Sequence, residues 1–121
     1  AADDGTTRTM IKNAHSTRGV SLVFNKKQLP WFTLWKDTAG APDGYVTGLE
    51  PGTSFSYNRR YQRPLNLVPT IAPKEHKQFQ ISYTLLADKV AVDNALKRVT
   101  EIQAGRDTEV RQAPLVDLTE H

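Results

Sequence analysis

The stretch Gly44-Tyr45-Val46-Thr47-Gly48-Leu49-Glu50-Pro51-Gly52-Thr53 combines a strand pattern with a sharp stop. Side chains alternate in character from residue 45 to residue 50, which predicts a β-strand. The Pro51-Gly52 pair predicts the turn that ends this strand. The carboxylate of Glu50 is therefore expected at the rim of a sheet, and this position makes Glu50 the leading candidate for chemistry.

Four further segments outward from this stretch are predicted to be strands. Residues 20–24 alternate, residues 65–71 form a short run, and residues 79–85 give the clearest half-buried pattern in the chain. Residues 31–35 are apolar on both faces, so we expect them to be covered on both sides. Between these segments, residues 53–63 carry aromatic and cationic side chains without a period, which predicts an irregular binding loop.

The ends of the chain differ from this β-rich middle. Residues 1–18 are polar with little periodicity, so we interpret them as a lead-in and expect ordered structure to begin near Gly19, with the β unit spanning residues 19–87. Apolar residues recur at helical spacing between residues 88 and 105, with Gly105 placed to end an amphipathic helix. Asp93 and Lys97 are expected to pair on its polar face. Residues 106–121 are interpreted as a polar tail.

Composition narrows the class of protein. The chain has 121 residues, enough for one modest domain or a piece of a larger one. Its formal net charge is +3, without a basic stripe, which does not indicate nucleic acid. No apolar run approaches the roughly 20 residues of a membrane-spanning helix. The chain starts without Met, which fits either a processed mature end or a fragment, and its compartment stays undetermined.

Metal and cofactor sites are not predicted. The chain has no cysteine, which excludes disulfides and thiolate ligands. Its three histidines, His15, His76 and His121, show no metal-ligand spacing, and no carboxylate cluster supports an ion.

Three motifs together resemble a known family. They are Leu29-Pro30-Trp31-Phe32-Thr33-Leu34-Trp35-Lys36, the stretch from Gly44 to Thr53 quoted above, and Ala72-Pro73-Lys74-Glu75. In their order and spacing they resemble the C-terminal portion of the aldose 1-epimerase or galactose mutarotase superfamily, in its less characterised aldose-epimerase-like branch. The resemblance covers about half of the chain, roughly residues 28–86.

The resemblance implies a fold and a reaction. The fold class expected is mainly β, an antiparallel β-sandwich with one C-terminal helix, and the ligand expected is a monosaccharide. The family's reaction interconverts sugar anomers, with a carboxylate that removes the proton of the anomeric hydroxyl and a histidine that protonates the ring oxygen. Glu50 matches the base. The acid belongs to motifs of an N-terminal half that this chain lacks, and neither His15 nor His76 matches it.

Other residues near Glu50 are candidates for binding the sugar. We expect substrate contacts from Tyr45, Thr53, Tyr57 and Arg59, while Trp31 and Trp35 are interpreted as core rather than as a stacking platform. The cluster of Arg59 with neighbouring arginines could clamp a phosphate or a uronate, although a solvated face is favoured.

Two alternatives to an enzyme stay open. One is a non-catalytic carbohydrate-binding module, and the other is a structural piece whose sheet edge pairs with another protein. Because a part of a sandwich leaves open edges, we expect the chain to associate with its missing half or with a copy of itself.

Overall fold

A computed structural model describes residues 1–113. The chain divides into two compact units, each described here by itself. Unit 1 contains Ala1–Gln28 and Phe79–Glu109, and unit 2 contains Leu29–Gln78 with the described residues that follow Glu109. Within residues 1–113, no helix has the length and apolar character needed to cross a membrane.

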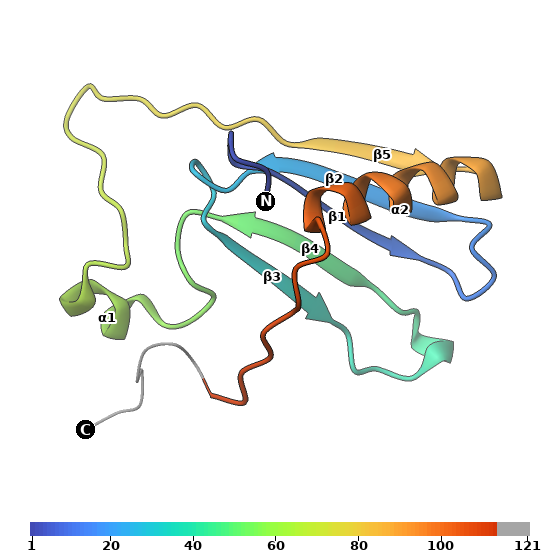
Figure 1. Cartoon of the computed structure of the whole chain (residues 1–121). Helices are drawn as coiled ribbons and strands as arrows, with labels where there is room; N and C mark the ends of the chain where they lie inside the picture. The colour runs from blue at the N-terminus through green and yellow to red at the C-terminus, as the bar shows by residue number, and fades with distance from the viewer. Residues whose placement is uncertain (114–121) are drawn as a thin grey trace. The chain divides into compact units, whose positions relative to one another are not determined.

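The framework of unit 1 is a three-stranded antiparallel sheet in the order β1-β2-β5 (Figure 1). The strands are β1 (Thr6–Lys12), β2 (Gly19–Asn25) and β5 (Ser82–Leu86). The central strand is the most buried, with Leu22 fully buried and Phe24 almost so. Ser21 of β2 lies between Met10 of β1 and Thr84 of β5 in the register, so these three residues share one face of the sheet.

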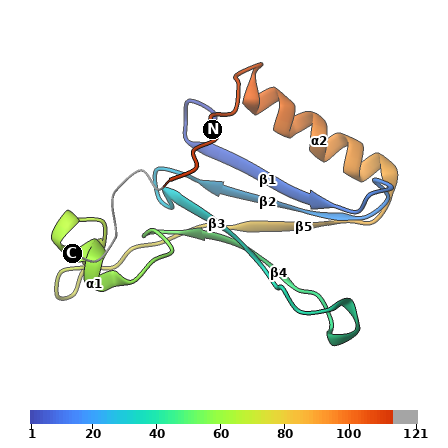
Figure 2. The same cartoon turned by 90° about the horizontal axis from the view of Figure 1, so that it is seen from below.

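Helix α2 (Lys89–Gln103) packs on this sheet and runs beside β1 (Figure 2). The Asp88 carboxylate caps its first turn by accepting a hydrogen bond of 2.8 Å from the Ala91 amide. Its last residue is followed by Ala104 in the left-handed conformation and by Gly105 at φ 69°. Apolar side chains join helix and sheet; they are Leu86, Val92 and Ala95, with Met10 and Ala91 packed against them. The predicted amphipathic helix is confirmed.

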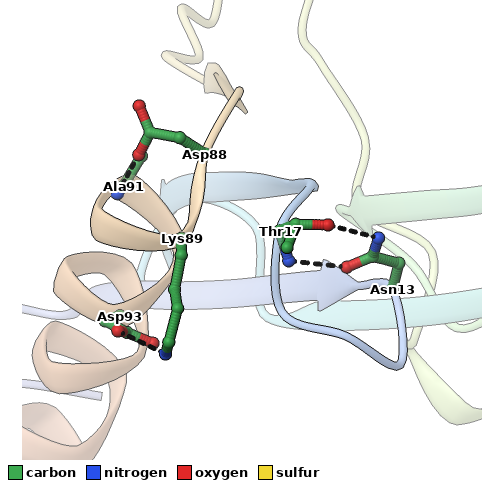
Figure 3. A network of polar contacts seen from close by, with 6 residues as sticks. All are labelled: Asn13, Thr17, Asp88, Lys89, Ala91 and Asp93. Carbon is green, nitrogen blue, oxygen red and sulfur yellow. Dashed lines mark hydrogen bonds and ion pairs between the residues drawn. The ribbon is translucent and has the colours of Figure 1, made fainter.

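The polar face of α2 carries a different ion pair from the one predicted. Lys89 Nζ lies 2.7 Å from Asp93 Oδ2, one turn earlier than the expected pair of Asp93 with Lys97 (Figure 3). Both side chains of the observed pair are more than half exposed, so its contribution to stability is small, about 0.3–0.5 kcal/mol. Figure 3 also shows the β1–β2 turn, where the Asn13 side chain accepts a 2.8 Å hydrogen bond from the Thr17 amide.

Unit 2 is built on a two-stranded antiparallel sheet of β3 (Trp31–Lys36) and β4 (Thr47–Gly52) (Figure 1). The short 3-10 helix η1 (Ala41–Asp43) lies in the connection between the two strands. After β4 the chain forms α1 (Arg59–Gln62) and the 3-10 turn η2 (Arg63–Leu65).

The fold class predicted from the sequence, mainly β with antiparallel sheets and one C-terminal helix, is confirmed. One expected strand, over residues 65–71, is not observed, and one strand that was not expected, β1, is present. Order begins before Gly19, because β1 pairs with the whole of β2. The threonines of β1 favour a strand but lack the apolar alternation on which the prediction depended. Residues 65–71 are not a strand, since Asn66 is left-handed at φ 55° and Pro69 has no amide to donate.

The expectation that residues 31–35 are covered on both sides is wrong for the described structure. Phe32, Leu34 and Trp35 are 36%, 46% and 48% exposed. A two-stranded sheet has too few neighbouring side chains to bury both faces of its strands.

Candidate functional site

The face of the β3–β4 hairpin that carries Glu50 also carries two tryptophans. Glu50 lies opposite Thr33 in the register, Gly48 lies opposite Trp35, and Gly52 lies opposite Trp31. Side chains of directly opposed residues project from the same face of an antiparallel pair. Glu50 is therefore flanked along its own strand by two glycines, and across the hairpin by two indoles on either side of a threonine hydroxyl.

The two glycines leave room on this face, and Glu50 uses the room above one of them. A Cβ atom at Gly48 would collide with Glu50 Oε1 and would lie 3.0 Å from Glu50 Cδ. The carboxylate thus occupies the space that a side chain at residue 48 would fill. Since Gly48 is the cross-strand partner of Trp35, the carboxylate of Glu50 lies on the side of the face that holds Trp35.

The two indoles differ in their surroundings. Trp31 is half-buried and makes an edge contact with Phe55, with ring centroids 5.1 Å apart and an angle of 62° between the planes. Trp35 is 48% exposed. The interpretation of both tryptophans as core is therefore wrong for Trp35, because glycine opposite it supplies no side chain to cover the ring.

The loop that follows β4 is held by a buried amide. Gln62 is fully buried, and its Nε2 donates hydrogen bonds of 2.8 Å to the Phe55 carbonyl and 2.6 Å to the Tyr57 carbonyl. The predicted irregular loop over residues 53–63 thus contains one helical turn, α1, whose last residue fixes the path of the chain before it. Gln62 therefore positions the backbone on which Tyr57 is carried.

The other predicted binding residues lie at different places in unit 2. Thr53 directly follows β4, whereas Tyr45 precedes it by two residues, so these two lie beyond opposite ends of the strand. Tyr45 is 61% exposed. Tyr57 is 48% exposed and packs against Tyr61 with ring centroids 5.9 Å apart. Arg59 is exposed at the start of α1. Thr53, Tyr57 and Arg59 thus follow the strand that carries Glu50 in the chain, whereas Tyr45 precedes it.

The position of Glu50 within its strand differs from the prediction. β4 does not stop at Glu50 but continues through Pro51, which lies opposite Phe32, to Gly52. A proline is tolerated here because the sheet has only two strands, so each strand has one edge that needs no donor. Glu50 consequently lies inside the paired region, where the backbone on both sides of it is fixed by β3.

Neither of the two described histidines belongs to the β3–β4 hairpin. His15 is exposed in the turn between β1 and β2, in unit 1, and His76 is exposed in unit 2 on the segment between η2 and β5. His121 lies outside the described residues. Among residues 1–113, no group of three or more histidine, aspartate and glutamate side chains could hold a metal ion.

Sequence reasoning missed the residues across the hairpin. Thr33 and Trp35 join Glu50 only through the β3–β4 register, and Gly48 matters only because of the carboxylate above it. Residues 31–35 and residues 45–50 are each predicted as strands, and an antiparallel pairing of these two strands would have limited the possible cross-strand partners of Glu50. The ten-residue connection between β3 and β4 did not indicate which register to choose.

Comparison with solved structures supports the family resemblance. The chain is 33% identical to a protein from Klebsiella pneumoniae subsp. pneumoniae MGH 78578 described as a "putative aldose 1-epimerase", with a TM-score of 0.88 over 97% of this chain. The chain spans 30% of the length of that protein. The resemblance to aldose-epimerase-like proteins is thereby confirmed, and the matched length fits a portion of such a protein.

Comparisons by sequence point to one family. No curated protein matches the chain. A family model matches residues 1–85, which is more than half of the chain and includes β1 to β4 and most of β5. The chain therefore belongs to the family described as a domain of unknown function, DUF4432.

Proposed function

We propose that this chain forms part of a sugar-isomerising protein of the aldose 1-epimerase type, in which Glu50 is the general base. The observation that carries the proposal is the hairpin face, where a carboxylate stands beside an exposed indole and a hydroxyl in a space opened by two glycines. Likeness to an aldose-epimerase-like structure supports the choice of substrate class.

The chemistry follows from the groups on this face. A ring-closed sugar opens when the anomeric hydroxyl loses its proton and the ring oxygen gains one, and it closes to either anomer by the reverse transfers. The Glu50 carboxylate can accept the first proton because it projects from the face rather than packing into it. The indole of Trp35 offers an apolar ring face for the C–H face of the sugar, and the Thr33 hydroxyl can hydrogen-bond a sugar hydroxyl.

Proton donation to the ring oxygen requires a second group. Neither His15 nor His76 belongs to the hairpin that carries Glu50. We propose that the acid comes from a segment outside this sequence, in keeping with the 30% of the related structure that the chain spans. That segment would associate with the chain and complete the monosaccharide site. Tyr57, Thr53 and Arg59 follow Glu50 along the chain and are proposed as further sugar contacts, with Tyr45 a more distant candidate.

The test is the exchange of α and β anomers, measured by magnetisation-transfer NMR on a panel of free hexoses. The protein is the chain together with whatever protein co-purifies with it, and the matched variant is Glu50→Gln, which keeps the shape of the side chain. We expect exchange above the buffer rate that Glu50→Gln lowers by about 10²–10⁴-fold, with sugar binding retained. Exchange that is unchanged in Glu50→Gln, or equal loss of binding and exchange, would contradict the role of base.

A second candidate function is a carbohydrate-binding module without turnover. The exposure of Trp35 favours it, because a platform for a sugar ring needs an uncovered indole but no acid. In that case sugars bind, Glu50→Gln weakens binding, and anomer exchange stays at the buffer rate. The same measurements thus separate the two functions.

A further inference from the structure

A cavity of about 210 Å³ lies between α2 and the sheet of unit 1, and every residue that lines it belongs to unit 1. Its polar lining comes from all three strands and the helix: Arg8 of β1, Ser21 of β2, Thr84 of β5, and Asn94 and Arg98 of α2. Its apolar lining belongs to the helix–sheet core, namely Leu86, Ala91 and Ala95. The cavity is therefore bounded by two guanidinium groups, two hydroxyls and an amide.

Arg8 lines this cavity and also has a buried donor without a partner among the described residues. Its Nη1 donates to Ser21 Oγ at 3.2 Å, but its Nε is buried and has no hydrogen-bond partner within residues 1–113. Burying a donor of a charged group without a partner costs roughly 1–3 kcal/mol or more, so such a donor is normally satisfied by protein, by ordered water or by a bound ion. The neighbouring Ser21 is 1% exposed, which fixes one end of the guanidinium.

Arg98 adds a second positive charge from the opposite wall. Asn94 and Arg98 are four residues apart on α2 and so lie on the same side of the helix. Neither Arg8 nor Arg98 forms an ion pair with a carboxylate in the described part of the chain. The residues that line the cavity include no aspartate or glutamate. Nothing in the lining neutralises the two charges.

We propose that this cavity binds a phosphate group, either as free phosphate or as the phosphate of a small ester. Arginine forks match tetrahedral phosphate oxygens, and the hydroxyl of Thr84 and the amide of Asn94 supply further donors. One buried water needs about 10–15 Å³, so the cavity has room for a phosphate group and the first atoms of its carrier. The proposal is independent of Glu50 and of the proposed isomerase activity.

The test is a titration of the ¹⁵N-labelled chain, with its co-purifying partner where there is one, followed by NMR at constant ionic strength. The probes are inorganic phosphate and glycerol phosphate, with chloride as the control anion. We expect saturable shifts of the Arg8 Nε–H signal and of the amides of Thr84, Asn94 and Arg98. Tighter binding of glycerol phosphate indicates an ester ligand, and equal or tighter binding of inorganic phosphate indicates the free ion.

Two helix variants make the test specific. Arg98→Gln is expected to weaken phosphate binding at least about tenfold, the loss that follows removal of one charge-assisted donor. Lys97→Gln removes the same charge from the adjacent exposed position, which does not line the cavity, and should change binding less than about twofold. Both positions are exposed, so both variants should fold. No saturable shift up to about 10 mM phosphate, or equal loss in the two variants, would overturn the proposal.

Discussion

The carboxylate of Glu50 lies over Gly48, the residue two positions before it on the same face of β4. A Cβ at residue 48 would collide with Oε1 and approach Cδ to 3.0 Å. The glycine is thus needed for the position of the carboxylate rather than for the backbone. At Gly52, on the other side of Glu50, an added Cβ would meet only backbone atoms of Ser54, at 3.4 Å and 4.0 Å.

Gly48→Ala should therefore displace the Glu50 carboxylate while leaving the hairpin folded. If Glu50 is the base, we expect anomer exchange to fall by about 10–100-fold, since an error of about 1 Å in the position of a catalytic group has an effect of this size. Exchange is measured by magnetisation transfer, and folding is checked by thermal unfolding. Gly52→Ala is the matched control and should retain exchange, because no atom of Glu50 lies near its Cβ. Equal effects of the two variants would contradict the steric argument.

Trp35→Ala should weaken sugar binding with little change in stability. The ring is 48% exposed and faces a glycine, so its removal exposes little new apolar surface. Trp31→Ala is the comparison. Its ring packs on Phe55, and its loss should lower the free energy of unfolding by roughly 2 kcal/mol. Sugar titrations and urea unfolding of both variants check the contrast. A larger stability loss for Trp35→Ala than for Trp31→Ala would contradict the assignment of Trp35 to an open face.

Gln62→Met should destabilise unit 2 by about 2 kcal/mol. The substitution keeps the length of the side chain but removes both hydrogen bonds to the carbonyls of Phe55 and Tyr57. Urea unfolding measures the loss, and amide hydrogen exchange over residues 53–58 should show faster opening of the loop. Gln78→Met, at an exposed position, is the control and should change stability by less than about 0.5 kcal/mol. Unchanged exchange in the loop would show that Gln62 does not hold it.

The elements that could be predicted from the sequence are those in which apolar side chains recur with the period of a helix or a strand. α2 was predicted to within two residues at each end because Asp88 and Gly105 mark its limits, and β2 was predicted from the alternation of Val20, Leu22 and Phe24. β1 was missed because its strand character comes from pairing with β2 rather than from apolar alternation. Pairing of this kind depends on residues distant in sequence, which local patterns do not contain.

The candidate site was likewise predictable only in part from the sequence. The sequence indicated Glu50 through its strand and through the family resemblance, and the structure places it on an accessible face. The cross-strand arrangement of Thr33 and Trp35 depends on register, where a shift of one residue would place Glu50 with Phe32 and Leu34 instead. The phosphate cavity could not be found from sequence, because Arg8 and Arg98 are brought together only by the packing of α2 on the sheet.

Asp4 gives the stability of unit 1 a defined pH dependence. Hydrogen bonds from the Thr6 amide and then from the Thr6 hydroxyl hold the pKa of the Asp4 carboxyl below its usual 3.8. The folded pKa is thus lower than the unfolded one, so the carboxylate contributes stability above pH 3.8 that is lost as pH falls through the folded pKa. Asp4→Asn should lower the midpoint of urea unfolding at neutral pH, and the difference from wild type should narrow below pH 3.8. A difference that is constant with pH would contradict this linkage.

Ala104→Gly should stabilise the chain by about 1 kcal/mol, an unusual direction for a substitution to glycine. Ala104 ends α2 at φ 51°, a left-handed conformation in which a Cβ is crowded by the backbone, and glycine removes that strain. Urea unfolding measures the gain. Two control variants are compared with it. Gly105→Ala, at φ 69°, introduces the same strain and should lower the free energy of unfolding by about 1 kcal/mol. Ala95→Gly, inside α2, should lower the free energy of unfolding by at least as much. If Ala104→Gly destabilised the chain as Ala95→Gly does, the helix would continue past residue 104 in solution.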